Sequence, residues 1–140
     1  MPRPEVIIRM AKNDDGDVIE RLMELVVAFQ WDNWKIDWHD IEPNWLAAEI
    51  NGEVVGVIQV VPAKPIGRIE CLVINPTLPL LTRTRVMRSL TNYGISVVRM
   101  HGAQAVSSMI PRRYSDYLAQ GLSEDWIELD DGAMLAKRLV

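Results

Sequence analysis

The apolar positions of the chain follow two different periods, and the change of period predicts where its elements lie. β-branched residues dominate residues 5–11, which is typical of a strand. Across residues 18–29 the apolar positions recur every three or four residues, the spacing of one face of a helix. Aspartates just before that run can accept the unpaired N–H groups of a helix start. We therefore expect a strand followed by a helix.

A second helix is expected over residues 31–41. Trp31, Trp34, Trp38 and Ile41 are spaced to share one helical face, and the polar residues between them would face water. A proline two residues further on should end this helix, because proline lacks the N–H that a helix needs.

The middle of the chain predicts three strands. Residues 45–50 and 53–61 flank Asn51-Gly52, a pair that favours a tight hairpin because both central positions of its turn need a positive φ. Residues 68–74 are apolar at nearly every position, which is typical of a strand buried on both faces at the centre of a sheet.

The last part of the chain continues the alternation of strands and helices. A long helix should follow the segment 77–85 and run to about His101, and residues 103–109 should form a strand. A helix between two strands implies a right-handed parallel crossover. A short helix over residues 111–121 and a hairpin over residues 125–140 complete the expected order, β-α-α-β-β-β-α-β-α-β-β. This order predicts an α/β fold with a mixed sheet.

Length and charge narrow the class of protein. A chain of 140 residues is the size of one domain with its own core, so we expect a single domain over residues 1–140. Hydrophobic residues make up 49% of the chain, a globular balance that excludes general disorder. The net charge of −4 argues against a general nucleic-acid binder, which needs a basic surface.

The few cysteines and histidines argue against disulfide bonds and metal sites. Cys71 is the single cysteine, so no intrachain disulfide can form, which fits a reducing cytoplasm. Two histidines and one cysteine do not give the spacing of a metal site, and we expect no metal. No apolar run approaches the roughly 20 residues of a membrane helix, and the first residues lack the apolar core of a signal peptide. The expected location is the cytoplasm.

The order of elements and three short segments resemble the GNAT acyltransferase superfamily. AEINGEVVGV resembles the hairpin of its second and third strands, and IECLVINP resembles its central strand. YSDYLAQGL resembles a late signature in which Tyr117, Gly121 and Leu122 take the positions of a tyrosine, a glycine and a final aromatic residue. The resemblance covers nearly the whole chain and implies a GNAT-like acyl-CoA N-acyltransferase fold.

The resemblance also implies that acetyl-CoA is a co-substrate. Its pantetheine arm would lie in a V-shaped opening beside the central strand, bonded to backbone groups of Leu72, Val73 and Ile74. Its pyrophosphate would lie on N–H groups at the start of the long helix, which is an anion site by its dipole. The residues at this second position are Arg83, Thr84, Arg85 and Val86.

The phosphate loop departs from the family pattern. The family's glycines let backbone amides approach phosphate, whereas residues 78–88 contain three arginines and no glycine. Arginine side chains such as Arg83 and Arg85 could replace part of the amide cradle, since guanidinium binds phosphate well. Alternatively, the site has decayed and the arginines form a solvated helix start. A second departure is Ile110 and Arg113, which stand where the family often has asparagine and alanine.

Two residues are candidates for acid–base catalysis. By resemblance, Glu70 on the central strand would take the proton of the amine, and its alternative role is an ion pair with Arg68. By resemblance, Tyr117 would protonate the departing thiolate, and its alternative role is a surface tyrosine, with Tyr114 a possible substitute. Cys71 is expected to be a small core residue on the face opposite to Glu70.

The tryptophan stripe over residues 31–38 is expected to be core, with an acceptor pocket or a homodimer contact as alternatives. The neighbouring residues Asp37, His39, Asp40 and Glu42 form either a solvated rim or a receiver for a cationic amine. The expected function is transfer of an acetyl group from acetyl-CoA to an unknown amine. The alternative is a GNAT-fold binding or regulatory protein without catalysis.

Overall fold

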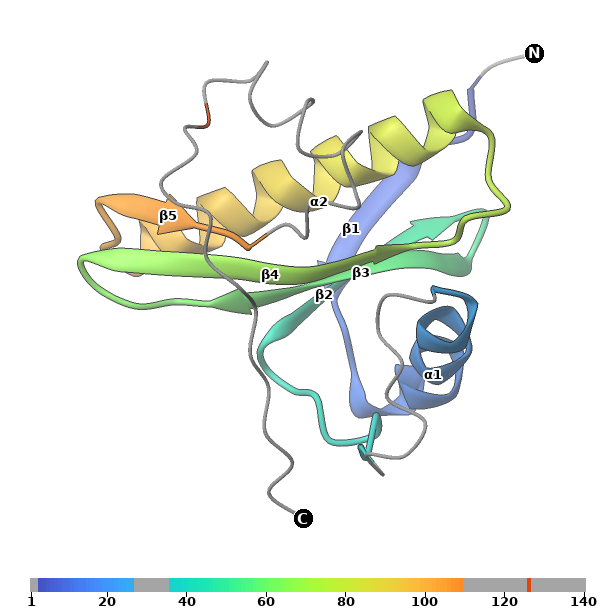
Figure 1. Ribbon diagram of the computed structural model, residues 1–140, viewed down its shortest axis with the longest axis horizontal. Helices are drawn as coiled ribbons and strands as arrows, with labels where there is room; N and C mark the ends of the chain where they lie inside the picture. The colour runs from blue at the N-terminus through green and yellow to red at the C-terminus, as the bar shows by residue number, and fades with distance from the viewer. Residues whose placement is uncertain (1–2, 27–35, 110–125, 127–140) are drawn as a thin grey trace.

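The structure is a computed structural model that describes residues 3–26, 36–109 and 126. The described residues form one five-stranded sheet in the order β1-β2-β3-β4-β5 (Figure 1). Neighbouring strands are antiparallel, except β4 and β5, which are parallel. The strands are β1 (Val6–Met10), β2 (Trp45–Ile50), β3 (Glu53–Val61), β4 (Ile66–Ile74) and β5 (Ala105–Ser107). The expected mixed sheet with a parallel crossover is therefore confirmed.

The two described α-helices lie on opposite faces of this sheet. Helix α2 (Leu80–Met100) covers one face, and α1 (Gly16–Leu25) lies against the other, after the 3-10 turn η1 (Asn13–Asp15) (Figure 1). Each face has its own apolar core. The α2 core includes Leu46, Ile58, Val60, Ile69, Val86 and Leu90. The α1 core includes Ile19, Leu22, Met23, Ile41, Trp45, Val57 and Val73.

Strand β4 supplies side chains to both cores, as expected for a strand buried on both faces. Ile69 and Ile74 lie in the α2 core, and Val73 lies in the α1 core. Helix α2 lies very close to β4, because a Cβ atom on Gly67 would be 2.7 Å from the Cβ of Val98. Carbon atoms pack best at about 3.5–4.0 Å, so only glycine allows this approach.

The boundaries of β2 and β3 agree with the sequence pattern, whereas β5 covers only Ala105–Ser107 of the predicted residues 103–109. The predicted strands over residues 45–50 and 53–61 are β2 and β3, and the turn between them has positive φ at Asn51 (53°) and Gly52 (80°). The short helix predicted over residues 111–121 and most of the predicted last hairpin lie outside the described residues.

The second helix predicted over residues 31–41 is wrong in its described part. Residues 36–41 form turns and no helix. Residues 27–35, with Trp31 and Trp34, lie outside the described residues.

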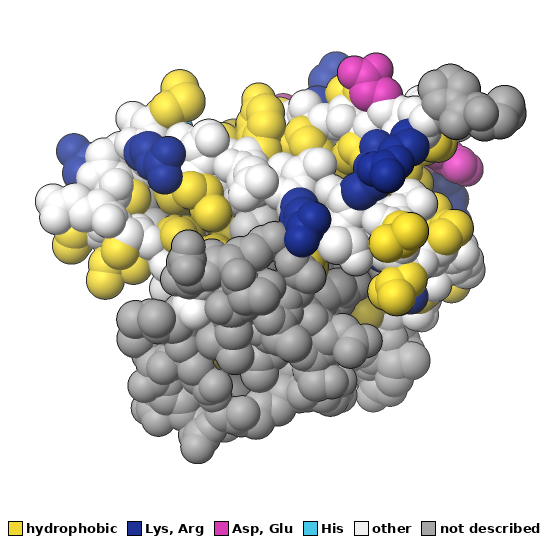
Figure 2. Space-filling view, turned by 90° about the horizontal axis from the view of Figure 1, so that it is seen from above, with side chains coloured by type: hydrophobic (Ala, Val, Ile, Leu, Met, Phe, Trp, Pro, Cys, Tyr) yellow, Lys and Arg dark blue, Asp and Glu magenta, His cyan; other side chains and the backbone are white. Residues whose placement is uncertain are grey.

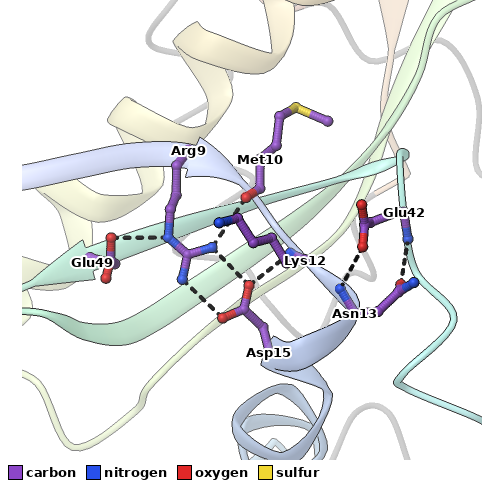
Figure 3. A network of polar contacts seen from close by, with 7 residues as sticks. All are labelled: Arg9, Met10, Lys12, Asn13, Asp15, Glu42 and Glu49. Atoms are coloured by element: carbon purple, nitrogen blue, oxygen red, sulfur yellow. Dashed lines mark hydrogen bonds and ion pairs between the residues drawn. The ribbon is translucent and has the colours of Figure 1, made fainter.

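Side chains that bond to the backbone explain why residues 36–41 are not helical. The carboxylate of Asp37 accepts the N–H of His39 at 2.9 Å. The amide oxygen of Asn13 accepts the N–H groups of Ile41 at 3.0 Å and of Glu42 at 3.1 Å, while the N–H of Asn13 donates to the Glu42 carboxylate (Figure 3). Such bonds give the backbone an alternative to helical pairing. They also tie this segment to the start of α1.

A second group of polar contacts joins β1, β2 and η1. Both terminal nitrogens of Arg9 donate to the carboxylate of Asp15, at 2.7 and 2.9 Å, and its Nε donates to Glu49 at 3.0 Å (Figure 3). The same Asp15 carboxylate accepts the N–H of Lys12 at 2.8 Å. The hydrogen bonds from Arg9 are the main reason that the pKa of Asp15 is lowered. This pairing fixes the entry of the chain into α1.

Candidate functional site

The central feature of the site is a β-bulge in β4. Strand β3 pairs with β4 through Gln59–Glu70 and Val57–Val73, so three steps along β4 match two steps along β3. The extra residue lies at Cys71, whose φ is +55°. A positive φ is uncommon for any residue other than glycine, and it marks the turn-like position of a bulge.

The bulge changes which face the neighbouring side chains occupy. Ile69 lies in the α2 core and Leu72 packs against that core, so the two residues between them both lie on the α1 face. Cys71 packs against the α1 core. The expectation that Glu70 and Cys71 point to opposite faces is therefore wrong, because strict alternation fails where a residue is inserted into one strand.

Strand β4 pairs with β5 only over its first residues. The parallel pairing covers Ile66 with Ala105 and ends at Arg68 with Ser107. In the described part of the chain, Val73 and Ile74 pair with β3 on one side and with no strand on the other. An open strand edge of this kind can bond to an extended ligand as if the ligand were another strand.

Helix α2 begins beside this open edge. It starts at Leu80 after Pro79, earlier than the TRTR segment that the sequence pattern favoured, and the N–H of Arg83 already donates to the Pro79 carbonyl at 2.9 Å. The N–H groups without a partner in the helix are therefore those of residues 80–82, because only the first turn leaves its donors free. The backbone amides of residues 83–86 lie inside the helix.

The turn that leads from β4 into α2 is held by Asn75. Its side-chain oxygen accepts the N–H of Thr77 at 3.0 Å and the hydroxyl of Thr77 at 2.7 Å. Its own N–H donates to the carbonyl of Val55 at 2.8 Å. The turn therefore holds the first turn of α2 at the end of β4.

The side chains of the predicted phosphate segment have different surroundings. Val86 is fully buried in the α2 core, and the Thr84 hydroxyl donates to the Leu80 carbonyl at 3.1 Å. A terminal nitrogen of Arg85 donates to the carbonyl of Pro4 at 2.8 Å. The Nε of Arg83 is buried and has no acceptor among the described residues. Arg83 is therefore the residue of this segment with an unmet need for an acceptor.

Basic charge gathers around α2. The helix carries four arginines and no acidic residue. Figure 2 looks onto the α2 side and shows Lys and Arg side chains spread over it, with acidic side chains only towards one end. A positive surface beside a helix N-terminus attracts anions.

Glu70 lies near the bulge with its carboxylate partly accessible. Its side chain is 28% exposed, and the nearest Arg68 nitrogen lies 3.9 Å from it. A contact at this length with a half-exposed arginine is a weak ion pair, so the carboxylate is not held by a strong partner there. Tyr117 and Tyr114, the candidate acids, lie outside the described residues.

Burial raises the pKa of the Cys71 thiol to about 11, and the nearby Glu70 carboxylate adds to the shift. The group is therefore a neutral thiol near neutral pH. A protonated thiol is a poor nucleophile, so Cys71 acts as a packing residue.

A cavity of about 230 Å³ opens on the α1 face next to the bulge. It extends from Trp45 on β2 to Cys71 on β4, and Trp38 meets Trp45 edge to face with ring centroids 6.0 Å apart. Sequence reasoning named Trp38 as part of a possible acceptor pocket, but it missed the contribution of Cys71. The lining residues are Met23, Ile36, Asp37, Trp38, Asp40, Ile41, Trp45 and Cys71.

The described residues show neither a metal cluster nor a membrane helix. No group of three or more His, Cys, Asp or Glu side chains among them is placed to hold a metal ion. None of the described helices is long and apolar enough to cross a membrane.

Comparisons with known proteins identify the fold. Neither a protein-family model nor a curated protein sequence matches this chain. A transcriptional regulator from Bacillus halodurans is similar in structure, with a TM-score of 0.77 at 13% identity over 95% of this chain and 100% of that chain. An aminoglycoside N-acetyltransferase in complex with CoA is similar with a TM-score of 0.66 at 14% identity over 99% of each chain. Ard1 from Thermoplasma volcanium is similar with a TM-score of 0.73 at 16% identity over 89% of this chain and 84% of that chain. The chain therefore has the fold of the GNAT acetyltransferase superfamily.

Proposed function

We propose that the chain is an acyl-CoA-dependent N-acyltransferase that moves an acetyl group from acetyl-CoA to an amine. The observation that carries this proposal is the bulge at Cys71. Among the described residues, the edge of β4 beside this bulge has no strand partner beyond Arg68, and it leads to the first turn of α2. An open strand edge suits the amides of a pantetheine arm, and a helix N-terminus suits phosphate.

Arg83 supports a phosphate site in spite of the missing glycines. Its buried Nε has no acceptor among the described residues, and an unpaired buried donor destabilises a protein. A phosphate oxygen would satisfy this donor with a charge-assisted hydrogen bond. The first-turn amides of residues 80–82 would supply the remaining donors.

The proposed reaction needs few groups from the protein. The amine nitrogen attacks the thioester carbonyl carbon, the C–S bond breaks, and an amide forms. Glu70 takes the proton that the amine loses, directly or through a water, and Tyr117 gives a proton to the departing thiolate. Backbone N–H groups on the open edge of β4 polarise the carbonyl.

Titration calorimetry with acetyl-CoA and with CoA tests the binding step. We expect Arg83→Gln to weaken binding about tenfold or more, since a hydrogen bond from a charged group contributes about 1.5–3 kcal/mol. The matched control is Arg99→Gln, which removes the same charge from the last turn of α2 and should leave affinity nearly unchanged. No heat and no thermal shift at millimolar CoA would refute the proposal.

Acetyl transfer tests the chemical step. Glu70→Gln keeps the size of the side chain and removes the base, so we expect kcat to fall by about 10²- to 10⁴-fold. Tyr117→Phe should lower kcat in the same way while CoA still binds. Unchanged kcat in both variants would remove these two residues from the mechanism.

A second candidate function is a binding or regulatory protein without catalysis. It is favoured by the glycine-free helix start and by Arg85, which is engaged with the Pro4 carbonyl. The similarity to a structure described as a transcriptional regulator fits this reading as well. Capture of one specific protein partner, unaffected by Tyr117→Phe and without any CoA binding, would favour it.

A further inference from the structure

We infer that the acceptor is a small monoamine carrying one aromatic or apolar group, and that it binds in the cavity between Trp45 and Cys71. The inference rests on the proposed acyltransferase function and names the substrate class of that site. This substrate class is inferred from three features of the cavity: its size, the residues that line it and the charges around it.

The size of the cavity limits the ligand to one ring with a short arm. Its volume is about 230 Å³, below the range of about 300–1,000 Å³ that is usual for drug-sized ligands. Each water in the liquid takes about 30 Å³, so the cavity holds roughly the volume of seven or eight waters. A multi-ring aminoglycoside is larger than that space and would extend out of the cavity into solvent.

The residues that line the cavity favour a ligand with an apolar ring. Met23, Ile41 and Trp45 are buried and close the inner part of the cavity, and Trp38 stands edge to face against Trp45. Two indole rings at this angle form a corner that can hold another ring by stacking and edge contacts. Poly-hydroxylated sugars would lose their hydrogen bonds to water against these walls.

The charges around the cavity favour a cation. Asp37 and Asp40 line its exposed rim, and Glu70 lies on the same face beside Cys71. Among the described residues, Arg68 lies 3.9 Å from Glu70, and His39 lies 3.5 Å from Asp37 and 2.9 Å from Asp17. The carboxylates described around the cavity outnumber these basic groups, so an ammonium is preferred over a carboxylate. The neutral Cys71 thiol adds no charge.

The geometry orients the ligand. Trp45 lies on β2 and Cys71 on β4, with β3 between them, so the two ends of the cavity are about two strand spacings, or about 10 Å, apart. A ring in the tryptophan corner with a two-carbon arm reaches towards Cys71. Its amine then lies on the side of Glu70, where the proposed base is.

Direct titration of the full chain with 2-phenylethylamine tests this inference, with and without CoA. The probes for comparison are 2-phenylethanol, which lacks the charge, 3-phenylpropionate, which reverses it, and the aminoglycoside sisomicin. We expect the amine to bind at least about fivefold more tightly than the alcohol, and the other two to give no measurable heat.

Two pairs of variants locate the binding. Asp40→Asn should weaken binding of the amine about two- to fivefold without changing that of the alcohol. Asp14→Asn, which changes an exposed aspartate that does not line the cavity, should change neither. Cys71→Met fills the floor and should weaken the amine about tenfold, whereas Cys71→Ser keeps the size and should not. Thermal melting checks that each variant is folded.

The outcomes separate this inference from the proposed function. If CoA binds but the amine and the alcohol bind equally well, the inference is wrong and the proposed acyltransferase function still stands. The same holds if CoA binds and sisomicin binds more tightly than the amine. Amine binding that responds to Asp40→Asn and Cys71→Met, without any CoA binding, supports the cavity's ligand class and overturns the acyltransferase.

Discussion

Replacing Cys71 by serine should change how the stability of the protein depends on alkaline pH. The folded protein holds this thiol at a pKa of about 11, against 9.0 for the free group, because the thiol is buried beside Glu70. The unfolded chain therefore loses the proton at lower pH than the folded protein does. A raised folded pKa stabilises the protein fully below about pH 9, and this stabilisation is lost as pH rises towards about pH 11.

The magnitude follows from the two pKa values. A shift from 9.0 to about 11 corresponds to roughly 3 kcal/mol once both states are ionised. At about pH 10 roughly half of this loss should have appeared. Serine is close to cysteine in size and does not titrate in this range, so Cys71→Ser should lack this part of the decline.

Urea unfolding under reducing conditions measures the difference. The free energy of unfolding of both proteins is followed from about pH 7 to about pH 10, and the gap between them is compared at each pH. Other groups titrate equally in both proteins and cancel. Two parallel curves would mean that the thiol is not held protonated, and the described position of Cys71 against the α1 core would then be wrong.

Three further predictions concern the fold. Gly67→Ala places a Cβ against Val98 and should cost about 1–3 kcal/mol, seen as a lower Tm. Gly52→Ala meets no atom within 4 Å, so its cost of about 1 kcal/mol comes from the positive φ alone. An unchanged Tm in Gly67→Ala would contradict the close approach of α2 to β4. Asp15→Asn breaks the pairing with Arg9, so the variant should lose about 1–3 kcal/mol near neutral pH. The pKa of Asp15 is lowered in the folded protein, so this difference should shrink as the pH falls through that lowered pKa, and an unchanged difference in strong acid would refute the role of the ion pair.

Local sequence signals predicted much of the fold. Strands β2 and β3 begin and end where the apolar pattern and Asn51-Gly52 place them. Residues 68–74 were correctly assigned to a strand buried on both faces. These features depend on neighbours in sequence or on burial alone, so a pattern of residue types is sufficient to identify them.

The candidate site was harder to predict because it depends on contacts between distant residues. Nothing at Cys71 signals a bulge, since a positive φ usually favours glycine, and the insertion is visible only against β3. The turns over residues 36–41 depend on Asn13, which is remote in the sequence. The start of α2 was placed too late because the two exposed leucines before the TRTR segment carry no helix-start signal.

The bulge could be removed without moving any other side chain of β4 to a new face of the sheet. Ile69 and Leu72 lie on one face, and Glu70 and Val73 lie on the other. Without Cys71, these residues would alternate regularly between the two faces. The chain can thus be read as a regular strand with one residue added. A one-residue deletion at this position would keep the alternation of side chains between the two cores and remove the bulge. Substitutions cannot do this, since they change the side chain and leave the count of residues as it is.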